Sequence, residues 1–235
     1  MDLPILDQSD FTGVVDVTQN SQVGDNLDIY ITKYTEEYVR EIFSDKAYQE
    51  IRDTTTAQKY LDLINGCDYV NSGGVNKITK GFKDILKSFI YYHFVGDNFT
   101  NMLGGNSQSF QQNAQPASNS VNLSIVNGRY NSAIVQLRND LYPFIYEFEN
   151  MSAEVITSVD NGDLTYTLTC DDLKYMIDGD TLTIGSTTYT AASVDTDDNK
   201  VTITGASTGL DFTGDDIGYE PYEDFNKPYM ETIFL

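Results

Sequence analysis

The chain has 235 residues and carries 36 acidic against 14 basic side chains, a formal net charge of −22. Affinity for a phosphate backbone comes from lysine and arginine that displace counterions, so this balance excludes a protein that wraps nucleic acid. It is compatible with a wall past which DNA slides, because an anionic surface repels phosphates. No apolar run approaches the roughly 20 residues of a membrane helix, and the first residues lack a basic and apolar leader. We therefore expect a soluble protein of a reducing cytoplasm, without a membrane partner.

The charge and the period of the sequence both change near residue 150. The first 150 residues hold 19 acidic and 11 basic side chains, whereas the last 85 hold 17 and 3. Cys67 and Cys170 lie one in each part, which disfavours a disulfide, and two thiols make no metal framework. Seventeen tyrosines and 12 phenylalanines suit either subunit contacts or an ordinary core.

The first part of the chain predicts an extended arm followed by helices. Residues 1–33 are polar with scattered apolar positions and indicate an extended N-terminal arm. Tyr34, Tyr38 and Ile42 then recur every four residues, and Thr35 before two glutamates is typical of a helix start. Two short helices follow, around "SDKAYQEIRD" and "AQKYLDLIN". The stretch "NGCDYVNSGGVN" interrupts the helical pattern.

The only histidine of the chain, His93, lies in the stretch "KGFKDILKSFIYYHFVGDN". One helical face is predicted by the spacing of Phe82, Ile85, Leu86, Phe89, Ile90 and His93. Gly96 predicts the end of this helix. Asp97 is the only carboxylate at helical spacing, and the sequence contains no nucleophile elbow, HExxH or phosphate-binding glycine loop. We interpret His93 as a structural residue, hydrogen-bonded to a backbone group or a tyrosine.

A polar segment and a long helix complete the helical part. Residues 98–122 are rich in Asn, Gln, Ser and Gly and predict a long loop. After this segment, apolar residues recur at helical spacing at Val126, Tyr130, Ala133, Leu137, Leu141, Phe144 and Phe148. This spacing predicts a long helix that Pro143 kinks or divides. Residues 34–151 are therefore expected to form an α-helical domain of about four to five helices.

From residue 152 apolar residues recur at every second position, which predicts strands and a small β-barrel or sandwich over residues 152–214. Leu164, Tyr166, Leu168 and Cys170 alternate with threonines, and the pair Asn161-Gly162 indicates a hairpin turn. In all, about five short strands are expected. The fold class is thus α+β: an N-terminal α-helical bundle, an inserted all-β domain and an extended C-terminal arm at 215–235.

The acidic turn "DTDDNK" resembles the start of an EF-hand loop. Asp195, Asp197 and Asn199 match its first ligand positions, but Lys200 stands where the turn requires glycine and Ala206 where it requires glutamate. A polar hairpin turn is the favoured interpretation, and a weak surface calcium site is left open. No catalytic, cofactor-binding or metal-binding residues are predicted, and no cofactor is expected. An enzyme that uses scattered carboxylates is the weakest of the hypotheses.

The C-terminal arm carries aromatic residues that suit interfaces between subunits. These interface candidates are Tyr219, Tyr222, Phe225, Tyr229 and Phe234.

The order of features over residues 25–150 resembles a family of phage proteins. "ITKYTEEYVREIFSDKAYQEI" is followed by "YLDLINGCDYV", by the "KGFKDILKSFIYYHFVGDN" helix, by the polar loop and by "GRYNSAIVQL". This order is similar to that of the head–tail connector, or neck ring, proteins of tailed bacteriophages, most of all those of crAss-like and other phages of Bacteroidetes hosts.

The resemblance implies a helical virion structural protein and no enzyme. It implies a homo-oligomeric ring of about twelve copies that sits under the portal protein, contacts other neck and tail proteins, and lets genomic double-stranded DNA pass without specific binding. The protein would be assembled in the host cytoplasm and reside in the virion neck. The β-domain departs from the family pattern, and the alternative is a binding or decoration module mounted on a helical base.

Overall fold

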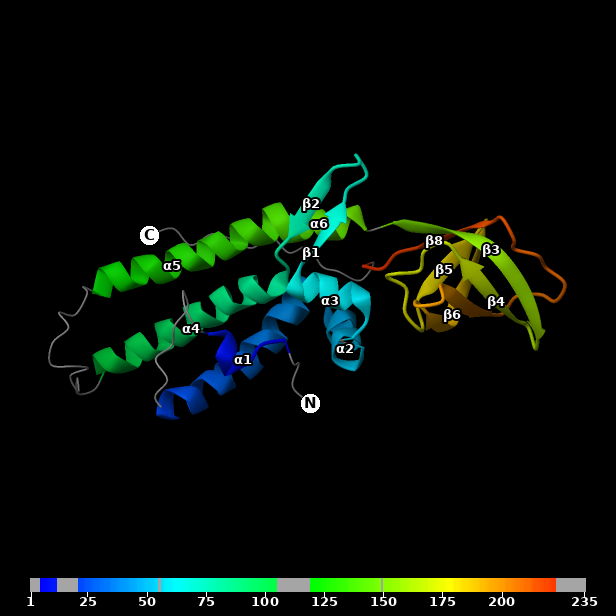
Figure 1. The fold of residues 1–235 in the computed structure, drawn as a ribbon. Coiled ribbons are helices and arrows are strands. Elements are labelled where there is room, and N and C mark those ends of the chain that lie inside the picture. The colour runs from blue at the N-terminus through cyan, green and yellow to red at the C-terminus, as the bar shows by residue number, and fades with distance from the viewer. Residues whose placement is uncertain (1–4, 12–20, 55, 105–118, 149, 223–235) are drawn as a thin grey trace.

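The structure, a computed structural model, describes residues 5–11, 21–54, 56–104, 119–148 and 150–222. These residues form two hydrophobic cores. One core lies among the helices and includes Tyr222, and the other lies inside a β-barrel. The helices and the barrel occupy opposite ends of an elongated molecule (Figure 1). The mixed α+β class predicted from the sequence is confirmed.

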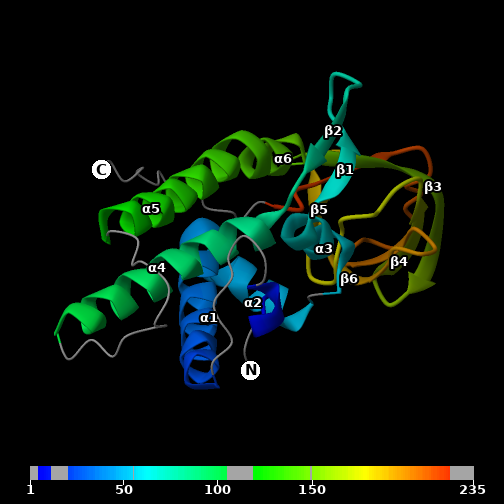
Figure 2. The ribbon, with the colours of Figure 1, turned by 60° about the vertical axis from the view of Figure 1, so that its left-hand side comes forward.

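The helical part is built around three long helices that lie side by side, α1, α4 and α5 (Figures 1 and 2). The helical elements, in chain order, are η1 (Gln8–Asp10), α1 (Ser21–Ile42), α2 (Asp45–Asp53), α3 (Gln58–Asn65), α4 (Phe82–Gly104), α5 (Asn119–Gln136), the π-helical turn η3 (Leu137–Leu141) and α6 (Tyr142–Glu147). The two short helices expected after α1 are present, and Ser44 caps α2 by accepting a hydrogen bond from the Ala47 amide.

The expected arm at 1–33 is wrong for the residues described within it. Helix α1 begins at Ser21, and its buried stripe already includes Leu27 and Ile31. These two positions precede Tyr34 by seven and three residues, so they continue the same helical face. Thr35, the expected helix start, is a buried residue inside α1. Ahead of the helix, residues 5–11 pack on the helical core through Ile5, Leu6 and Phe11.

Helix α4 runs past Gly96, where the sequence predicted its end. A glycine keeps its backbone N–H and C=O groups, so it weakens a helix by about 1 kcal/mol without stopping it. The hydroxyl of Tyr30 on α1 donates to Asp97 Oδ2 at 2.8 Å, one residue beyond this glycine. The predicted loop 98–122 is correspondingly shorter, because Asn98–Gly104 belong to α4 and Asn119–Asn122 to α5. Residues 105–118 lie outside the described part.

Pro143 divides the last helical run, as predicted. The run continues α5 into the π-helical turn η3, in which the Tyr142 amide donates to Leu137 five residues earlier. Helix α6 then starts with Pro143 in its first turn. A proline is accommodated beside the π-helical turn, because hydrogen bonding there already departs from the regular α-helical ladder to which proline cannot donate.

A β-hairpin that the sequence did not predict rises from the helical part between α3 and α4 (Figure 1). Its strands are β1 (Cys67–Val70) and β2 (Asn76–Thr79), paired antiparallel. Asn71 closes the turn by accepting a hydrogen bond from the Val75 amide through its side chain. Four-residue strands are too short for a period-two pattern to stand out in a sequence.

Six antiparallel strands close the barrel in the order β3-β4-β7-β6-β5-β8. Their bounds are Met151–Gly162 (β3), Thr165–Cys170 (β4), Thr181–Ile184 (β5), Thr187–Asp195 (β6), Lys200–Thr204 (β7) and Asp216–Tyr219 (β8). The barrel therefore extends over residues 151–219 and includes one strand more than the five expected. Residues 216–219, predicted as part of the arm, pair with both β3 and β5 and close the barrel.

The β3–β4 turn lies two residues later than predicted. Asn161 and Gly162 end β3, and the turn is formed by Asp163 and Leu164, whose φ angles are 55° and 60°. The "DTDDNK" segment forms the β6–β7 turn, with Asp195 paired to Lys200, as the hairpin interpretation predicted. Among the described residues, no helix is both long and apolar enough to cross a membrane.

Candidate functional site: the junction of helices and barrel

Helix α3 and the barrel exchange charged contacts at their junction. Lys59 and Asp62 lie three residues apart on α3 and therefore share a face. Each meets an opposite charge from the segment between β4 and β5, Lys59 meeting Asp180 and Asp62 meeting Lys174. The helix thus supplies one cation and one anion, and the barrel supplies their complements. This reciprocal arrangement fixes which part of the barrel can face α3.

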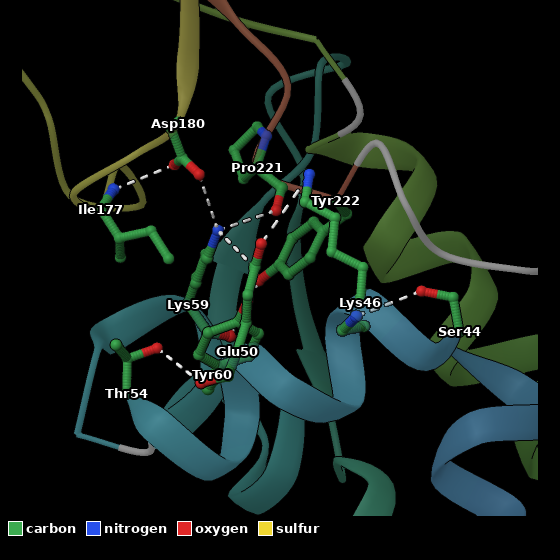
Figure 3. A network of polar contacts seen from close by, with 11 residues as sticks. Ser44, Lys46, Glu50, Thr54, Lys59, Tyr60, Ile177, Asp180, Pro221 and Tyr222 are labelled. Atoms are coloured by element: carbon green, nitrogen blue, oxygen red, sulfur yellow. Dashed lines mark hydrogen bonds and ion pairs between the residues drawn. The ribbon is translucent and has the colours of Figure 1, made fainter. Parts of the chain in front are cut away.

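Lys59 is the most deeply buried charged residue of the junction, with only 1% of its surface exposed. Its Nζ lies 3.5 Å from Asp180 Oδ1 and 3.7 Å from Glu50 Oε2 on α2, and it donates to the Pro221 carbonyl at 3.3 Å (Figure 3). One ammonium therefore joins α2, the β4–β5 segment and the chain that leaves the barrel. A buried ammonium group requires such partners, because desolvation of a charge is costly.

Asp62 is held by donors from both sides of the junction. Lys174 Nζ and Tyr175 Oη each donate to its Oδ2 at 2.7 Å, and Gln58 on the same helix donates to its Oδ1 at 2.6 Å. Lys174 also donates to the Tyr175 hydroxyl at 2.9 Å. These charge-assisted hydrogen bonds satisfy a carboxylate that is largely buried.

Aromatic rings complete the junction. Tyr222 is 2% exposed, packs in the helical core and donates its hydroxyl to the Lys59 carbonyl at 3.0 Å. Phe148, which leads from α6 to β3, packs against both cores. Its ring meets Tyr175 edge to face at 5.1 Å and Tyr69 of the hairpin at 5.7 Å. The rings therefore link hairpin, helices and barrel through direct contact.

Burial shifts the pKa of several titratable groups at the junction. Burial, supported by the Asp62 charge, raises the pKa of the Cys67 thiol to about 11, so the thiol stays protonated and unreactive at neutral pH. Burial also raises the pKa of the Asp180 carboxyl, although the nearby Lys59 ammonium opposes this shift. Burial raises the pKa of the Tyr222 hydroxyl well above its ordinary value. The raised pKa values keep the Cys67 thiol and the Tyr222 hydroxyl protonated at neutral pH, and the junction as a whole can orient the barrel.

His93 lies between α1 and α4, away from this junction. Its ring stacks on Tyr34 with centroids 3.9 Å apart, and its Nε2 lies 2.7 Å from the Tyr38 hydroxyl. A tyrosine partner was one of the two predicted options, and the structure confirms it. Burial lowers the pKa of His93, whereas the charges of Glu37 and Asp97 act in the opposite direction. His93 is therefore a packed aromatic of the α1–α4 interface.

The interface candidates of the C-terminal segment fall into two groups. Tyr219 ends β8 inside the barrel core, and Tyr222 packs in the junction, so both rings are covered by their own chain. The prediction that these two residues anchor subunit interfaces is wrong, because Tyr219 is enclosed in the barrel core and Tyr222 in the helical core. Phe225, Tyr229 and Phe234 lie outside the described residues.

Neither the thiols nor the acidic turn forms a metal centre in the described part. Cys67 and Cys170 are both free thiols. In the β6–β7 turn, Asp195 accepts a hydrogen bond from the Asp198 amide, and Lys200 pairs with Asp198 at 2.7 Å. Over the described ranges, no group of three or more His, Cys, Asp or Glu residues is arranged to hold a metal ion.

Sequence reasoning missed the junction residues because their partners are distant in the chain. Lys59 and Asp180 are separated by 121 positions, and Asp62 and Lys174 by 112. The available signal was local and weak: in "QKYLDLIN" a cation and an anion share a helix face beside an apolar stripe. Such a pair is usually solvated, so it does not by itself predict burial.

Comparison with known proteins gives no relatives for this chain: no family model matches it, and no curated protein or solved structure is significantly similar.

Proposed function

We propose that this protein is a structural virion protein of a tailed bacteriophage, a head–tail connector. In this proposal about twelve copies form a ring that joins the portal to the tail and lines the DNA exit channel. The proposal assigns the chain no catalytic role and no cofactor. It builds on the resemblance of residues 25–150 to neck ring proteins.

The observation that carries the proposal is the exposure of apolar side chains at two separate places on the chain. On the β1–β2 hairpin, Val70 and Ile78 are 58% and 72% exposed, and at the β3–β4 end of the barrel, Val159 and Leu164 are 54% and 55% exposed. Exposed apolar patches commonly mark binding sites. A ring subunit has two neighbours and needs two different surfaces to meet them.

Two further features support a connector. Reciprocal ion pairs and aromatic contacts at the junction hold the barrel in a fixed orientation on the helices. A connector subunit needs such a fixed orientation because it contacts the portal on one side and the tail on the other. The net charge of −22 gives a surface that repels phosphates, which suits a channel through which DNA moves without being retained.

Mass measurement and electron microscopy of the purified protein, alone and mixed with portal rings, test this function. The proposal predicts a closed ring stacked on one end of the portal. A protein that stays strictly monomeric and never joins portal rings contradicts it. Monomers in the absence of portal, followed by rings in its presence, agree with the proposal.

The alternative function is a binding or decoration module in which the barrel recognises a ligand and the helices only mount it. The barrel has its own hydrophobic core, which favours this alternative. Deletion of residues 151–219 separates the two, because the helical part keeps its own core, including Tyr222. Ring assembly that survives the deletion supports a decorative barrel, and ring assembly that is lost contradicts it.

A further inference from the structure

The sequence contains an asparagine followed by a glycine at three places, residues 65–66, 127–128 and 161–162. Such a pair can lose its side-chain amide spontaneously when the backbone nitrogen of the glycine attacks the carboxamide carbon of the asparagine. Glycine favours this reaction because it has no side chain to hinder the approach and its backbone is permissive. The nitrogen must also be free of the regular backbone hydrogen bonds, so the fold decides which pair reacts.

Two of the pairs are held in helical structure. Asn127 and Gly128 lie inside α5, where each backbone amide donates to the carbonyl four residues earlier. Asn65 is the last residue of α3, and the Gly66 amide donates to the Asp62 carbonyl at 2.9 Å. Reaction at either pair therefore requires a local opening of the structure first.

The third pair, Asn161-Gly162, lies at a bulge near the end of β3. The β3–β4 register shifts between Asp160 and Gly162, so Asn161 bulges out of the ladder. Gly162 has a φ of 74°, which glycine adopts readily, and residues 161–164 are all exposed. This pair is therefore open to water and lies outside the regular pairing of the strands.

The amide of Gly162 is directed at a carboxylate and not at a strand carbonyl. It donates to Asp160 Oδ1 at 2.9 Å. The other oxygen of Asp160 accepts hydrogen bonds from the Gly209 amide and the Tyr166 hydroxyl, each at 3.0 Å, which fixes the carboxylate in place. A carboxylate that is hydrogen-bonded to the attacking nitrogen is placed to take its proton.

The carboxamide of Asn161 is held beside the same turn by β4. Its Nδ2 lies 3.0 Å from Thr167 Oγ1 and 3.4 Å from Thr165 Oγ1, and the Thr167 hydroxyl is also within 3.4 Å of Oδ1. A hydroxyl donor beside a carbonyl oxygen stabilises the negative charge that develops there when a nucleophile adds to the carbon. Both reacting groups of this pair therefore have a polar partner suited to the reaction.

We propose that Asn161 is a site of spontaneous deamidation that Asp160 assists. The Gly162 nitrogen bonds to Asn161 Cγ while its proton passes to Asp160. The Cγ–Nδ2 bond then breaks, and Nδ2 takes up that proton and leaves as ammonia. The five-membered cyclic imide that remains reacts with one water molecule. Opening of the ring gives either aspartate or isoaspartate, in which the chain continues through the former side-chain carbonyl.

The modification changes the charge and the backbone of this end of the barrel. The product adds a carboxylate to a turn that already carries Asp160 and Asp163, and isoaspartate also lengthens the backbone. Asp160 ties the loop before β8 to this turn through the Gly209 amide, so the new charge lies beside a group that links two segments. This inference does not depend on the connector function, because it rests on the β3–β4 turn alone.

Peptide mapping by mass spectrometry of the full-length protein, incubated at neutral pH over a time series, tests the site. Asn161 should deamidate about tenfold or more faster than Asn65 and Asn127, because those two react only after local opening. In concentrated urea the three rates should lie close together, since unfolding removes the protection of the helical pairs. A folded protein in which Asn161 reacts no faster than the other two would overturn the proposal.

The variant Asp160→Asn tests the assisting carboxylate, because it keeps an acceptor for the Gly162 amide but cannot take its proton. Asp163→Asn is the matched control, since it removes an equal charge from the other side of the pair. Asn161 should react about tenfold or more slowly in Asp160→Asn and near the wild-type rate in Asp163→Asn. Circular dichroism and the unfolding midpoint establish that both variants are folded. Equal rates in the two variants would overturn the role of Asp160, and the comparison of the three pairs in the wild type tests the site without any variant.

Discussion

Lys59 shows how one residue links three parts of the chain. Its ammonium group is shared by Glu50, Asp180 and the Pro221 carbonyl, and almost none of it is exposed. Removal of one partner from a buried ion pair is expensive because the charge that remains is buried without compensation. Loss of Lys59 would therefore destabilise the fold mainly because it would leave the Asp180 carboxylate buried without a compensating charge.

The substitution Lys59→Met is expected to lower the free energy of unfolding by about 3 kcal/mol, since it leaves the Asp180 carboxylate buried beside an apolar chain. Urea unfolding followed by circular dichroism measures this. Lys46→Met is the matched control, because Lys46 pairs with the same Glu50 but is exposed. The control should cost about 1 kcal/mol or less. Equal losses for the two variants would contradict the role assigned to Lys59.

His93 predicts a pH dependence whose sign follows from its environment. Burial lowers the pKa of His93 in the folded protein, so the unfolded state binds the proton more readily. Above the unfolded value of about 6.5 both states are neutral, and below it protonation favours unfolding. The stability that His93 contributes is therefore present at neutral pH and lost on acidification.

This dependence is isolated by comparing the wild type with His93→Gln. The stability of the wild type relative to the variant should fall as the pH is lowered from about 7.5 to about 5.5. The comparison cancels the carboxylates that the two proteins share, including Glu37 and Asp97. Parallel stability profiles for the two proteins would show that His93 does not titrate in this range.

At the scale of elements, two glycines fix the base of the hairpin. Gly66 ends α3 with φ +82°, and Gly81 precedes α4 with φ +76°. A Cβ on Gly66 would overlap the Thr79 carbonyl, and one on Gly81 would overlap the Gly66 amide and the Ile64 carbonyl. The two strands therefore leave the helices as a closely packed pair of backbones that admits no side chain.

Gly66→Ala and Gly81→Ala should each lower the free energy of unfolding by about 3 kcal/mol, because backbone overlap adds to the cost of the positive φ. Gly74→Ala is the control: its φ is +72°, but the added Cβ would meet nothing within 4 Å. It should cost about 1 kcal/mol. Thermal and urea unfolding provide the comparison, and a control as damaging as the other two would disprove the overlap argument.

The elements that were predicted correctly are those whose signal is local. The apolar stripe of α4, the division at Pro143 and the alternation in β4 follow from spacings within one element. The start of α1 was missed because its first turns are polar, and β8 because four residues in a tyrosine-rich segment carry no clear period. Strand β8 is instead specified by tertiary pairing, because it forms hydrogen bonds with β3 on one side and with β5 on the other.

The candidate site could be predicted least. Its contacts join α3 to a segment more than a hundred residues away, and charged residues are normally solvated. The sequence likewise placed Tyr219 and Tyr222 on an arm, whereas tertiary packing encloses both. His93 was interpreted correctly because its helical stripe and the lack of a catalytic partner on its face are both local features.

At the scale of the whole molecule, the junction is expected to make the two cores unfold together. A variant with both Lys59→Met and Asp62→Asn removes the ammonium group of one charged link and the carboxylate charge of the other. Calorimetry should show one transition for the wild type and two for this variant, as coupling between the cores is lost. Lys200→Met, which breaks an exposed ion pair in the barrel, should keep one transition. A single transition in the junction variant would contradict the coupling.

The proposed function is a connector ring in the neck of a tailed phage. Imaging of phage particles whose protein carries a short epitope in the exposed β5–β6 turn at Gly185-Ser186, bound by an antibody fragment, tests it most directly. The proposed function predicts a ring of label at the single vertex where the tail joins the head. Particles without label, or label spread over the capsid surface, would contradict it.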